Sequence, residues 1–496
     1  MSRFVLVVDQ GTTSTKVSLV DDQGVTRVAS AAEFPQYFPA PGWVEHDPED
    51  LWRTTLDQLR AVRDAARVGA RDIAALAIAN QRETVVVWDR RSGEPLYPAI
   101  VWQDRRTSDE CEALTREGAE WVTHRTGLRL DPYFSATKIA WILDHVAGAR
   151  ERAQRGDLAA GTVDSWLIFR LTSGRAHVTD VTNASRTLLM NLATGTWDEE
   201  LCEIFRVPSS VLAEIRPSVG FFGDVDAQWL GEAVPIGAVI GDQQAALVGQ
   251  GCLTPGATKS TYGTGSFVLQ HTGASPVTST GSLLATAACA DAASSAQYAV
   301  EGSIFVTGAA LQWLRDGLGL LESAGESEDL ARSLSDNGDV WFVPALTGLG
   351  APHWDPRARG ILVGLTRGVT RAHLARAALE SIAFQTRDVL DAMNHLCGHS
   401  LPALRVDGGA TANRWLMQFL ADVVGVPVVV APSAEATMRG ATLAGGSFAG
   451  WWRLDDQRHD EGRTGERFEP RMSEDEREYL YSRWSRALER SLDWSE

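Results

Sequence analysis

A turn rich in glycine and hydroxyl groups, set between two apolar runs, most limits how this chain can fold. Residues 9–16 read Asp-Gln-Gly-Thr-Thr-Ser-Thr-Lys and join the apolar run 4–8 to a second run, 17–20. The pattern predicts a strand, a tight turn and a second strand. Backbone N–H groups and hydroxyls in such a turn suit phosphate oxygens, and the Asp9 carboxylate suits Mg²⁺. The turn indicates either a nucleotide-phosphate hairpin or an ordinary hairpin with a polar turn.

A second turn of the same kind occurs half a chain later. Residues 261–266 read Thr-Tyr-Gly-Thr-Gly-Ser, and just before them a Gly- and Pro-containing stretch near 249–256 breaks the pattern. A chain of 496 residues is too long for one hydrophobic core. We therefore expect one domain over 1–250 and another over 251–496. The repeated turn indicates a duplicated architecture with a nucleotide clamped between its halves.

Strands and helices alternate along the chain, which indicates an α/β architecture. An Asp-Pro cap predicts a helix over 51–66. Strands follow over 73–79 and 84–88, with a polar loop between them. A third glycine-rich loop, 407–413, ends a strand and opens a helix. Such a loop is typical of an anion or nucleotide site, and equally of a loop that serves packing alone.

Composition limits the partners and the compartment. The net charge is −18, from 46 Lys and Arg against 64 Asp and Glu, so the basic surplus that nucleic acid or anionic lipid favours is missing. Five scattered cysteines without a C-x-x-C pair indicate a reducing compartment. The chain enters a strand by residue 4, and no apolar run approaches the roughly 20 residues of a membrane span. We expect a cytoplasmic protein without stable membrane insertion.

The two commonest nucleotide-binding frameworks are absent from the sequence. The Walker A pattern requires a Gly-Lys dipeptide, but none of the three lysines, Lys16, Lys138 and Lys259, follows a glycine. No G-x-G-x-x-G occurs either. Any ATP site must therefore be built on a different framework.

Nine stretches, in order along nearly the whole chain, resemble the glycerol kinases of the FGGY carbohydrate-kinase family. They include the first turn, the Asn-Gln-Arg-Glu-Thr loop, the Gly-Asp-Gln-Gln segment and the second turn. The nine are 9–14, 41–48, 80–84, 99–107, 131–135, 180–187, 241–246, 261–265 and 347–352.

The resemblance implies a fold and an activity. The family fold is two actin-like (ribonuclease-H-like) α/β domains with an active-site cleft between them. The implied reaction is ATP- and Mg²⁺-dependent phosphorylation of glycerol to sn-glycerol 3-phosphate, by a homo-oligomer, either a dimer or a tetramer. Fold alone does not give function. The open alternatives are a kinase for another polyol or sugar, such as erythritol or a pentulose, an actin-like ATPase acting as a chaperone or filament, and a kinase that binds without turnover.

The resemblance also implies roles for single residues. Asp242 is implied as the base that faces the attacking hydroxyl, and Asp9 and Asp242 as the Mg²⁺ residues. The implied polyol contacts are Arg82, Glu83, Trp102, Tyr133, Asp242, Gln243 and Phe267. The implied ATP contacts are Thr12, Thr13, Ser14, Lys16 and Thr264 at the phosphates, and Gly308, Gln312, Gly409 and Asn413 at the adenosine.

The chemistry of these residue types agrees with those roles. Neighbours in a strand point to opposite faces, so only a loop lets Arg82 and Glu83 reach one ligand. An Asp with an ordinary pKa of about 3.9 is a weak base for an alcohol. Phosphoryl transfer tolerates this because its loose transition state needs little deprotonation before attack.

The sequence departs from the family in two places. Lys16 stands where most glycerol kinases have Arg, which loses the bidentate fork. Arg439 lies in 435–441, at a place that is usually apolar. In addition, some relatives are inhibited by fructose 1,6-bisphosphate or activated by histidine phosphorylation in a region that corresponds to 223–235. That window holds three carboxylates and no Lys, Arg or His, so we expect neither form of regulation there.

Overall fold

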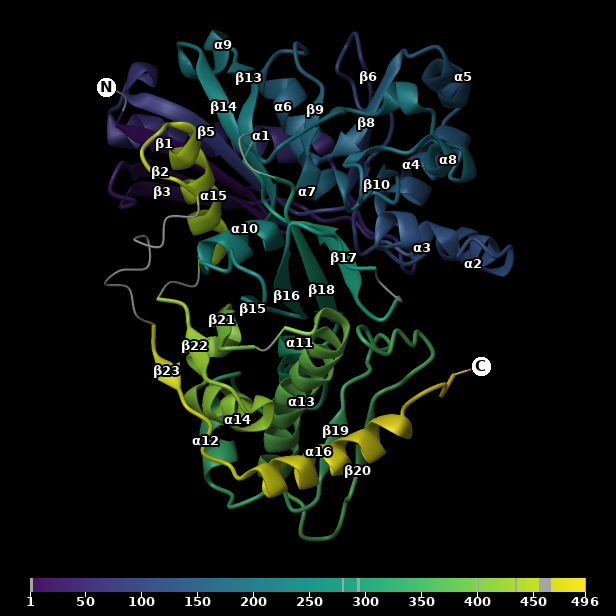
Figure 1. Cartoon of the computed structure of the whole chain (residues 1–496), viewed down its shortest axis with the longest axis vertical. Helices are drawn as coiled ribbons and strands as arrows, with labels where there is room; N and C mark the ends of the chain where they lie inside the picture. The colour runs from purple at the N-terminus through teal and green to yellow at the C-terminus, as the bar shows by residue number, and fades with distance from the viewer. Residues whose placement is uncertain are drawn as a thin grey trace.

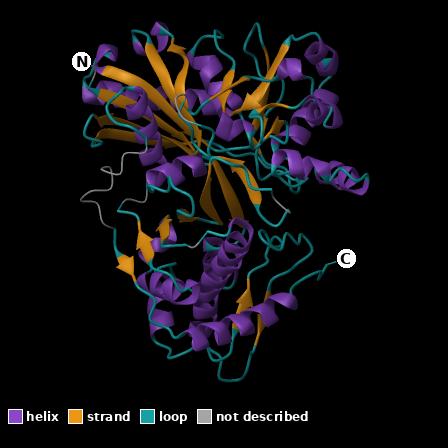
Figure 2. Ribbon diagram, in the orientation of Figure 1, coloured by secondary structure: helices purple, strands orange, loops and turns teal. Residues whose placement is uncertain are grey.

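The computed structural model has two halves stacked along its longest axis, each built around a central sheet (Figures 1 and 2). It describes residues 3–278, 281–291, 295–399, 401–432, 435–454 and 465–495. Among these residues, no helix is long and apolar enough to cross a membrane.

The first half contains a six-stranded sheet in the order β13-β14-β5-β1-β2-β3. Strands β1 and β2 are antiparallel, whereas β5 runs parallel to both β1 and β14. The middle strands are buried on both faces, which explains their continuous apolar sequences. The strands are β1 Phe4–Gln10, β2 Ser14–Asp21, β3 Thr26–Glu33, β5 Ile73–Asn80, β13 Val219–Val225 and β14 Val234–Gly241.

The second half contains a seven-stranded sheet in the order β17-β18-β16-β15-β21-β22-β23. Strands β15, β16 and β18 form an antiparallel meander, and β15 runs parallel to β21. The meander β1-β2-β3 beside β5 has the same arrangement, so the predicted duplication is confirmed. The strands are β15 Thr258–Tyr262, β16 Ser266–Gly273, β17 Leu284–Ala287, β18 Tyr298–Ile304, β21 Leu404–Asp407, β22 Val428–Val430 and β23 Arg467–Phe468.

The other described strands belong to four smaller sheets. A four-stranded sheet in the order β4-β7-β6-β8 adjoins the first sheet, and three strand pairs lie outside both large sheets. The four-stranded sheet holds β4 Glu45–His46, β7 Ala99–Ile100, β6 Val85–Asp89 and β8 Leu158–Thr162. The pairs are β9 Val178–Asp180 with β12 Glu214–Arg216, β10 Met190–Asn191 with β11 Thr196–Trp197, and β19 Trp341–Val343 with β20 Ile361–Val363.

Helices cover the sheets, and the predicted helix over 51–66 is confirmed as α1, which begins at Pro48 under an Asp47 side-chain cap. The helices of the first half are α1 Pro48–Ala66, α2 Ser108–Arg116, α3 Trp121–Thr126, α4 Ser135–His145, α5 Ala149–Gln154, α6 Val163–Leu171, α7 Val181–Ala184, α8 Glu199–Ile204, α9 Ala227–Leu230 and α10 Asp242–Gly249. Those of the second are α11 Gly308–Gln312, α12 Glu326–Arg332, α13 Arg371–Cys397, α14 Arg414–Val424, α15 Ala436–Phe448 and α16 Glu474–Glu489.

Helix α15 returns from the second half of the sequence to the first sheet. It packs on α10 and against β1, β5 and β14, and Figure 1 shows it beside β1 and β5. The approach is close because both helices carry glycine: a Cβ on Gly440 would lie 1.8 Å from the Ala245 carbonyl oxygen. This contact connects α10 with the second half of the chain.

Candidate active site

Arg82, Glu83 and Asp242 lie together at the edge where β5 and β14 end. Arg82 Nε is 3.3 Å from Asp242 Oδ1 and 3.9 Å from Glu83 Oε1. Glu83 has a φ of 61°, a left-handed conformation that is rare outside glycine. This backbone conformation allows the side chains of Arg82 and Glu83, neighbours in the chain, to lie on the same side of the loop. The structure therefore brings together three of the residues that the sequence implied for a polyol site.

Three aromatic rings from separate segments stand beside this charged cluster. The Trp102 ring lies 5.7 Å from the ring of Tyr133 and 6.3 Å from that of Phe267. Arg82 Cζ lies 5.9 Å from the Phe267 ring centre. Trp102 Nε1 donates a hydrogen bond of 3.0 Å to Thr12 Oγ1 in the first turn. The aromatic wall thus connects the predicted polyol residues with the predicted phosphate residues.

Two residues that the sequence patterns did not single out, Glu301 and Arg186, complete the charged cluster. Glu301 lies on β18 and accepts hydrogen bonds from Arg82 Nη1 at 2.5 Å and Arg186 Nη2 at 2.9 Å. Arg186 Nε donates to Glu83 Oε1 at 2.6 Å. Arg186 belongs to the matched stretch 180–187, so a signal for it existed, whereas Glu301 lies outside all nine stretches.

Burial and charge set the pKa values in this cluster. Burial raises the pKa of Glu83 above its ordinary value, against the effect of Arg82 and Arg186. For Glu301 burial acts in the same direction, but the guanidiniums of Arg186 and Arg82 outweigh it and lower the pKa to about 2. The lowered pKa favours the charged form of Glu301, which pairs with two cations.

Asp242 is the first residue of α10, and Gln243 follows it with a buried side chain. The Gln243 backbone N–H donates to Asp242 Oδ1 at 2.6 Å. Burial raises the pKa of Asp242, with Arg82 and that N–H opposing the change. The Gln243 side chain accepts a hydrogen bond of 2.6 Å from Lys259 Nζ on β15. Gln243 therefore lies in contact with the second half of the molecule.

The first turn is the hairpin that the sequence predicts. Asp9 and Lys16 are partners in the β1–β2 ladder, and Thr12, Thr13 and Ser14 lie at or next to the turn between the strands. Lys16 Nζ pairs with Glu435 at 2.9 Å, and both side chains are about half exposed. Such an exposed pair contributes little to stability, so it leaves the lysine available to a phosphate.

Asp9 is buried close to the charge of Asp242, and a divalent cation would reduce the repulsion between the two carboxylates. Burial first, and then the charge of Asp242, raise its pKa to about 7, with Lys16 acting in the opposite direction. Two carboxylates that disfavour each other's charge suit a Mg²⁺ ion, which is bound by one or two carboxylates together with substrate phosphates. No group of three or more His, Cys, Asp or Glu that could hold a metal occurs in the described part of the chain.

The other residues that the resemblance implied for ATP lie in the second half of the chain, at the second turn, on α11 and in the loop after β21. Gly308 N donates to Gly263 O at 3.1 Å, and Ala309 N donates to Thr264 O at 3.0 Å, so the turn and the start of α11 form one unit. Gln312 lies exposed at the end of α11, and Gly409 is exposed in the loop after β21. That loop ends at Asn413, whose side chain caps α14 by accepting from Leu416 N at 2.9 Å.

Family models match both halves of the chain. The N-terminal domain model of the FGGY family of carbohydrate kinases matches residues 4–249, and the C-terminal domain model matches 258–449. The chain belongs to the FGGY family of carbohydrate kinases. The expected fold of two actin-like (ribonuclease-H-like) domains is thereby confirmed.

Relatives cover nearly the full length. The chain is 52% identical to glycerol kinase from Ralstonia nicotianae over 98% of its own length and 97% of the relative's. It is 52% identical to glycerol kinase from Trichlorobacter lovleyi over 99% of each chain. The crystal structure of Plasmodium falciparum glycerol kinase with ADP superposes with a TM-score of 0.92 at 36% identity, covering 99% of this chain and 98% of the other. Xylulose kinase from Lactobacillus acidophilus shares the fold at 22% identity, with a TM-score of 0.87 and coverage of 98% and 97%.

Proposed function

We propose that this FGGY kinase phosphorylates glycerol with ATP, giving sn-glycerol 3-phosphate and ADP. The observation that carries the proposal is the meeting of Arg82, Glu83 and Asp242 beside an aromatic wall in a chain 52% identical to glycerol kinases along its whole length. Donors and acceptors for hydroxyls lie against rings that suit a short carbon backbone. An actin-like ATPase that transfers phosphate to no small-molecule acceptor would not require this arrangement of residues.

The reaction transfers one phosphoryl group. A terminal hydroxyl oxygen of glycerol forms a bond to the γ-phosphorus while the bond from that phosphorus to the bridging oxygen of ADP breaks. Asp242 orients the hydroxyl in line and accepts its proton late in the step. Its raised pKa makes it a stronger base than an exposed Asp. Arg82 and Glu83 orient the polyol by donating and accepting hydrogen bonds.

The nucleotide assignments follow from where the turns lie. In this proposal Thr12, Thr13, Ser14, Lys16 and Thr264 bind the phosphates, and Gly308, Gln312, Gly409 and Asn413 bind the adenosine. Asp9 and Asp242 would hold Mg²⁺, which supplies charge neutralisation at the phosphates. A homo-oligomeric state and a cytoplasmic location stay predictions.

A coupled assay of ADP release tests the function. Purified protein with ATP and Mg²⁺ is assayed alone and with glycerol, erythritol, D-xylulose or gluconate, and again after chelation of the metal. We expect release that depends on Mg²⁺ and is highest with glycerol. Equal ADP release with and without glycerol would defeat the proposal. A higher kcat/KM for one of the other compounds would identify that compound, and not glycerol, as the preferred substrate.

A further inference from the structure

Glu301 connects the two halves of the molecule at the polyol site. It lies in the middle of β18, a strand of the second sheet, and its side chain is 0% exposed. Its partners belong to the first half: Arg82 lies in the loop after β5, and Arg186 follows α7. Because the Glu301 side chain is not exposed, its effect on a bound ligand has to pass through the residues that it contacts, of which Arg82 and Arg186 are the charged hydrogen-bond partners.

The contacts hold Arg82 in one orientation. The Glu301 carboxylate accepts from Arg82 Nη1 at 2.5 Å and from Nη2 at 3.2 Å, a two-point contact that fixes the plane of the guanidinium. The stem of Arg82 is confined as well, because a Cβ on Gly241 would lie 2.8 Å from Arg82 Cδ. Gln244 adds a contact of 3.3 Å to Arg82 Nη1.

Charges alternate through the cluster, so each member depends on its neighbours. Arg186 donates to both Glu301 and Glu83, which places two cations and two anions in a buried group. All four side chains are at most 2% exposed. Removing one charge from such a buried group leaves another without compensation, so the remaining groups must rearrange.

We propose that Glu301 is a positioning residue that sets polyol affinity by fixing Arg82, and through Arg186 also Glu83. The second domain thereby determines the geometry of a polyol site whose contacts lie largely in the first. The inference rests on the proposed function, since it assigns Arg82 and Glu83 to the polyol.

The substitution Glu301→Gln tests the inference because it keeps the shape and removes the charge. We expect KM for glycerol to rise at least tenfold with a smaller fall in kcat, while KM for ATP stays within about twofold. Glu301→Asp keeps the charge but withdraws the carboxylate, and we expect it to restore part of the glycerol affinity. Circular dichroism and thermal unfolding check that each variant is folded.

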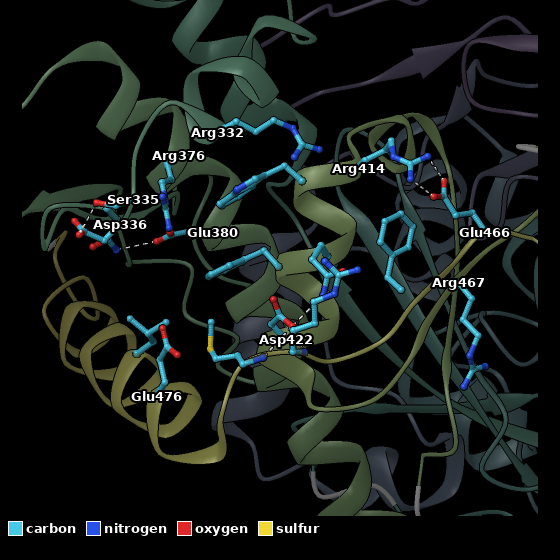
Figure 3. A pocket seen from close by; sticks show the side chains of 18 residues that line it. Arg332, Ser335, Asp336, Arg376, Glu380, Arg414, Asp422, Glu466, Arg467 and Glu476 are labelled. Carbon is cyan, nitrogen blue, oxygen red and sulfur yellow. Dashed lines mark hydrogen bonds and ion pairs between the residues drawn. The ribbon is translucent and has the colours of Figure 1, made fainter.

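A matched control exists in the second half, where Glu380 is also a buried carboxylate. It accepts from Arg376 Nε at 2.8 Å and from Asn337 Nδ2 at 2.8 Å. Arg376 and Glu380 line a separate cavity of about 490 Å³ between α13, α14 and α16, which Figure 3 shows. Glu380→Gln makes the same chemical change there, and we expect it to lower thermal stability while leaving KM for glycerol unchanged.

The outcomes separate the possible roles. If Glu301→Gln lowers stability as Glu380→Gln does but leaves KM for glycerol within twofold, Glu301 is merely structural and the inference is overturned. If Glu301→Gln does not fold, Glu301→Asp is the test: its shorter side chain withdraws the carboxylate from Arg82, so KM for glycerol should still rise above the wild-type value, and an unchanged KM overturns the inference. If the wild-type protein prefers another polyol, the proposed function fails, and the same KM comparison with that polyol tests the positioning role.

Discussion

Asp242 is buried, and the neighbouring groups that hold it in place oppose the effect of burial on its pKa. It pairs with Arg82 Nε at 3.3 Å, and its own helix N-terminus donates to it through Gln243 N. Burial raises its pKa, which moves the carboxylate toward the pH at which a general base is most useful. The position of Asp242 is therefore set by its neighbours rather than by the substrate.

Replacing Asp242 by Asn should nearly abolish turnover while glycerol still binds. The amide keeps the shape but loses the charge and the proton acceptor, and Arg82 retains its contact with Glu301. We expect a loss of at least about 100-fold in kcat, the lower end for general-base catalysis. Initial rates and calorimetric glycerol titration measure the two effects. A variant that retains more than about a tenth of the activity would place the base elsewhere.

His46 is a buried histidine that makes the fold sensitive to acid. Its side chain is fully buried, neither ring nitrogen has a hydrogen-bond partner among the described residues, and burial lowers its pKa to about 4. A histidine in the unfolded chain titrates near about 6.5. Between these values the unfolded chain holds a proton that the folded chain lacks. The cost that comes from protonation is therefore absent above about pH 6.5 and increases as the pH falls toward 4.

His46→Leu should remove this dependence. At pH 7.5 we expect the free energy of unfolding to change little or to rise, because two unpaired polar atoms are lost. The advantage of the variant over the wild-type protein should then grow by up to about 1.4 kcal/mol per pH unit below 6.5. Denaturant unfolding at pH 7.5, 6.0 and 5.0 measures it. A constant difference across these pH values would show that folding does not lower the pKa of His46.

At the level of elements, the packing of α10 on α15 connects the base to the second half of the chain. Cβ atoms on Gly249 and Gly440 would lie 2.0 Å and 1.8 Å from carbonyl oxygens of the opposite helix. Thr437 Oγ1 also donates to the Asp242 carbonyl at 3.3 Å. Separation of the two helices would therefore move Asp242.

Gly440→Ala should force the two helices apart. Overpacking of a tight interior typically costs about 1–3 kcal/mol, and a contact with rigid backbone should reach or exceed the upper value. We expect both the free energy of unfolding and kcat to fall. Gly325→Ala is the control, because its Cβ would meet only Ser323 Oγ at 3.8 Å in an ordinary αR conformation. Equal stability of the two variants would contradict the close helix packing.

At the level of the whole molecule, the two halves contribute different parts of the site. The first turn lies in the first half, whereas the residues proposed for adenosine lie in the second. A nucleotide bound to both must draw them together, and phosphoryl transfer requires water to be excluded. The buried cluster of Arg82, Glu83, Arg186 and Glu301 already connects the halves beside the polyol residues, so closure should occur on the nucleotide side.

We expect the radius of gyration in solution scattering to fall when glycerol and a non-hydrolysable ATP analogue are added together. Glycerol alone should have a smaller effect, because its proposed contacts are already connected across the halves. Scattering of the free protein and of each complex at equal concentration measures the change. A radius that stays constant in all of them would indicate a rigid or already closed cleft.

Features that depend on local interactions could be predicted from the order of residues alone. The first hairpin, the helix that begins at Pro48 and the strand 73–79 follow from turn residues, a cap and apolar periodicity, each within a few positions of the chain. Motif order along the chain also indicated the family and brought Arg82, Glu83 and Asp242 to attention. Their roles toward a ligand stay predictions.

The contacts between distant segments could be found only in the folded molecule. Glu301 reads as one polar residue in an apolar strand, and the packing of two sheets gives it Arg82 and Arg186 as partners. The window 223–235 contains no cation, yet folding pairs two of its three carboxylates, Asp226 and Glu232, with Arg175 and Arg71. Helix α15 likewise returns to the first sheet. These contacts join residues far apart in the chain, so no local pattern of charge or hydrophobicity records them.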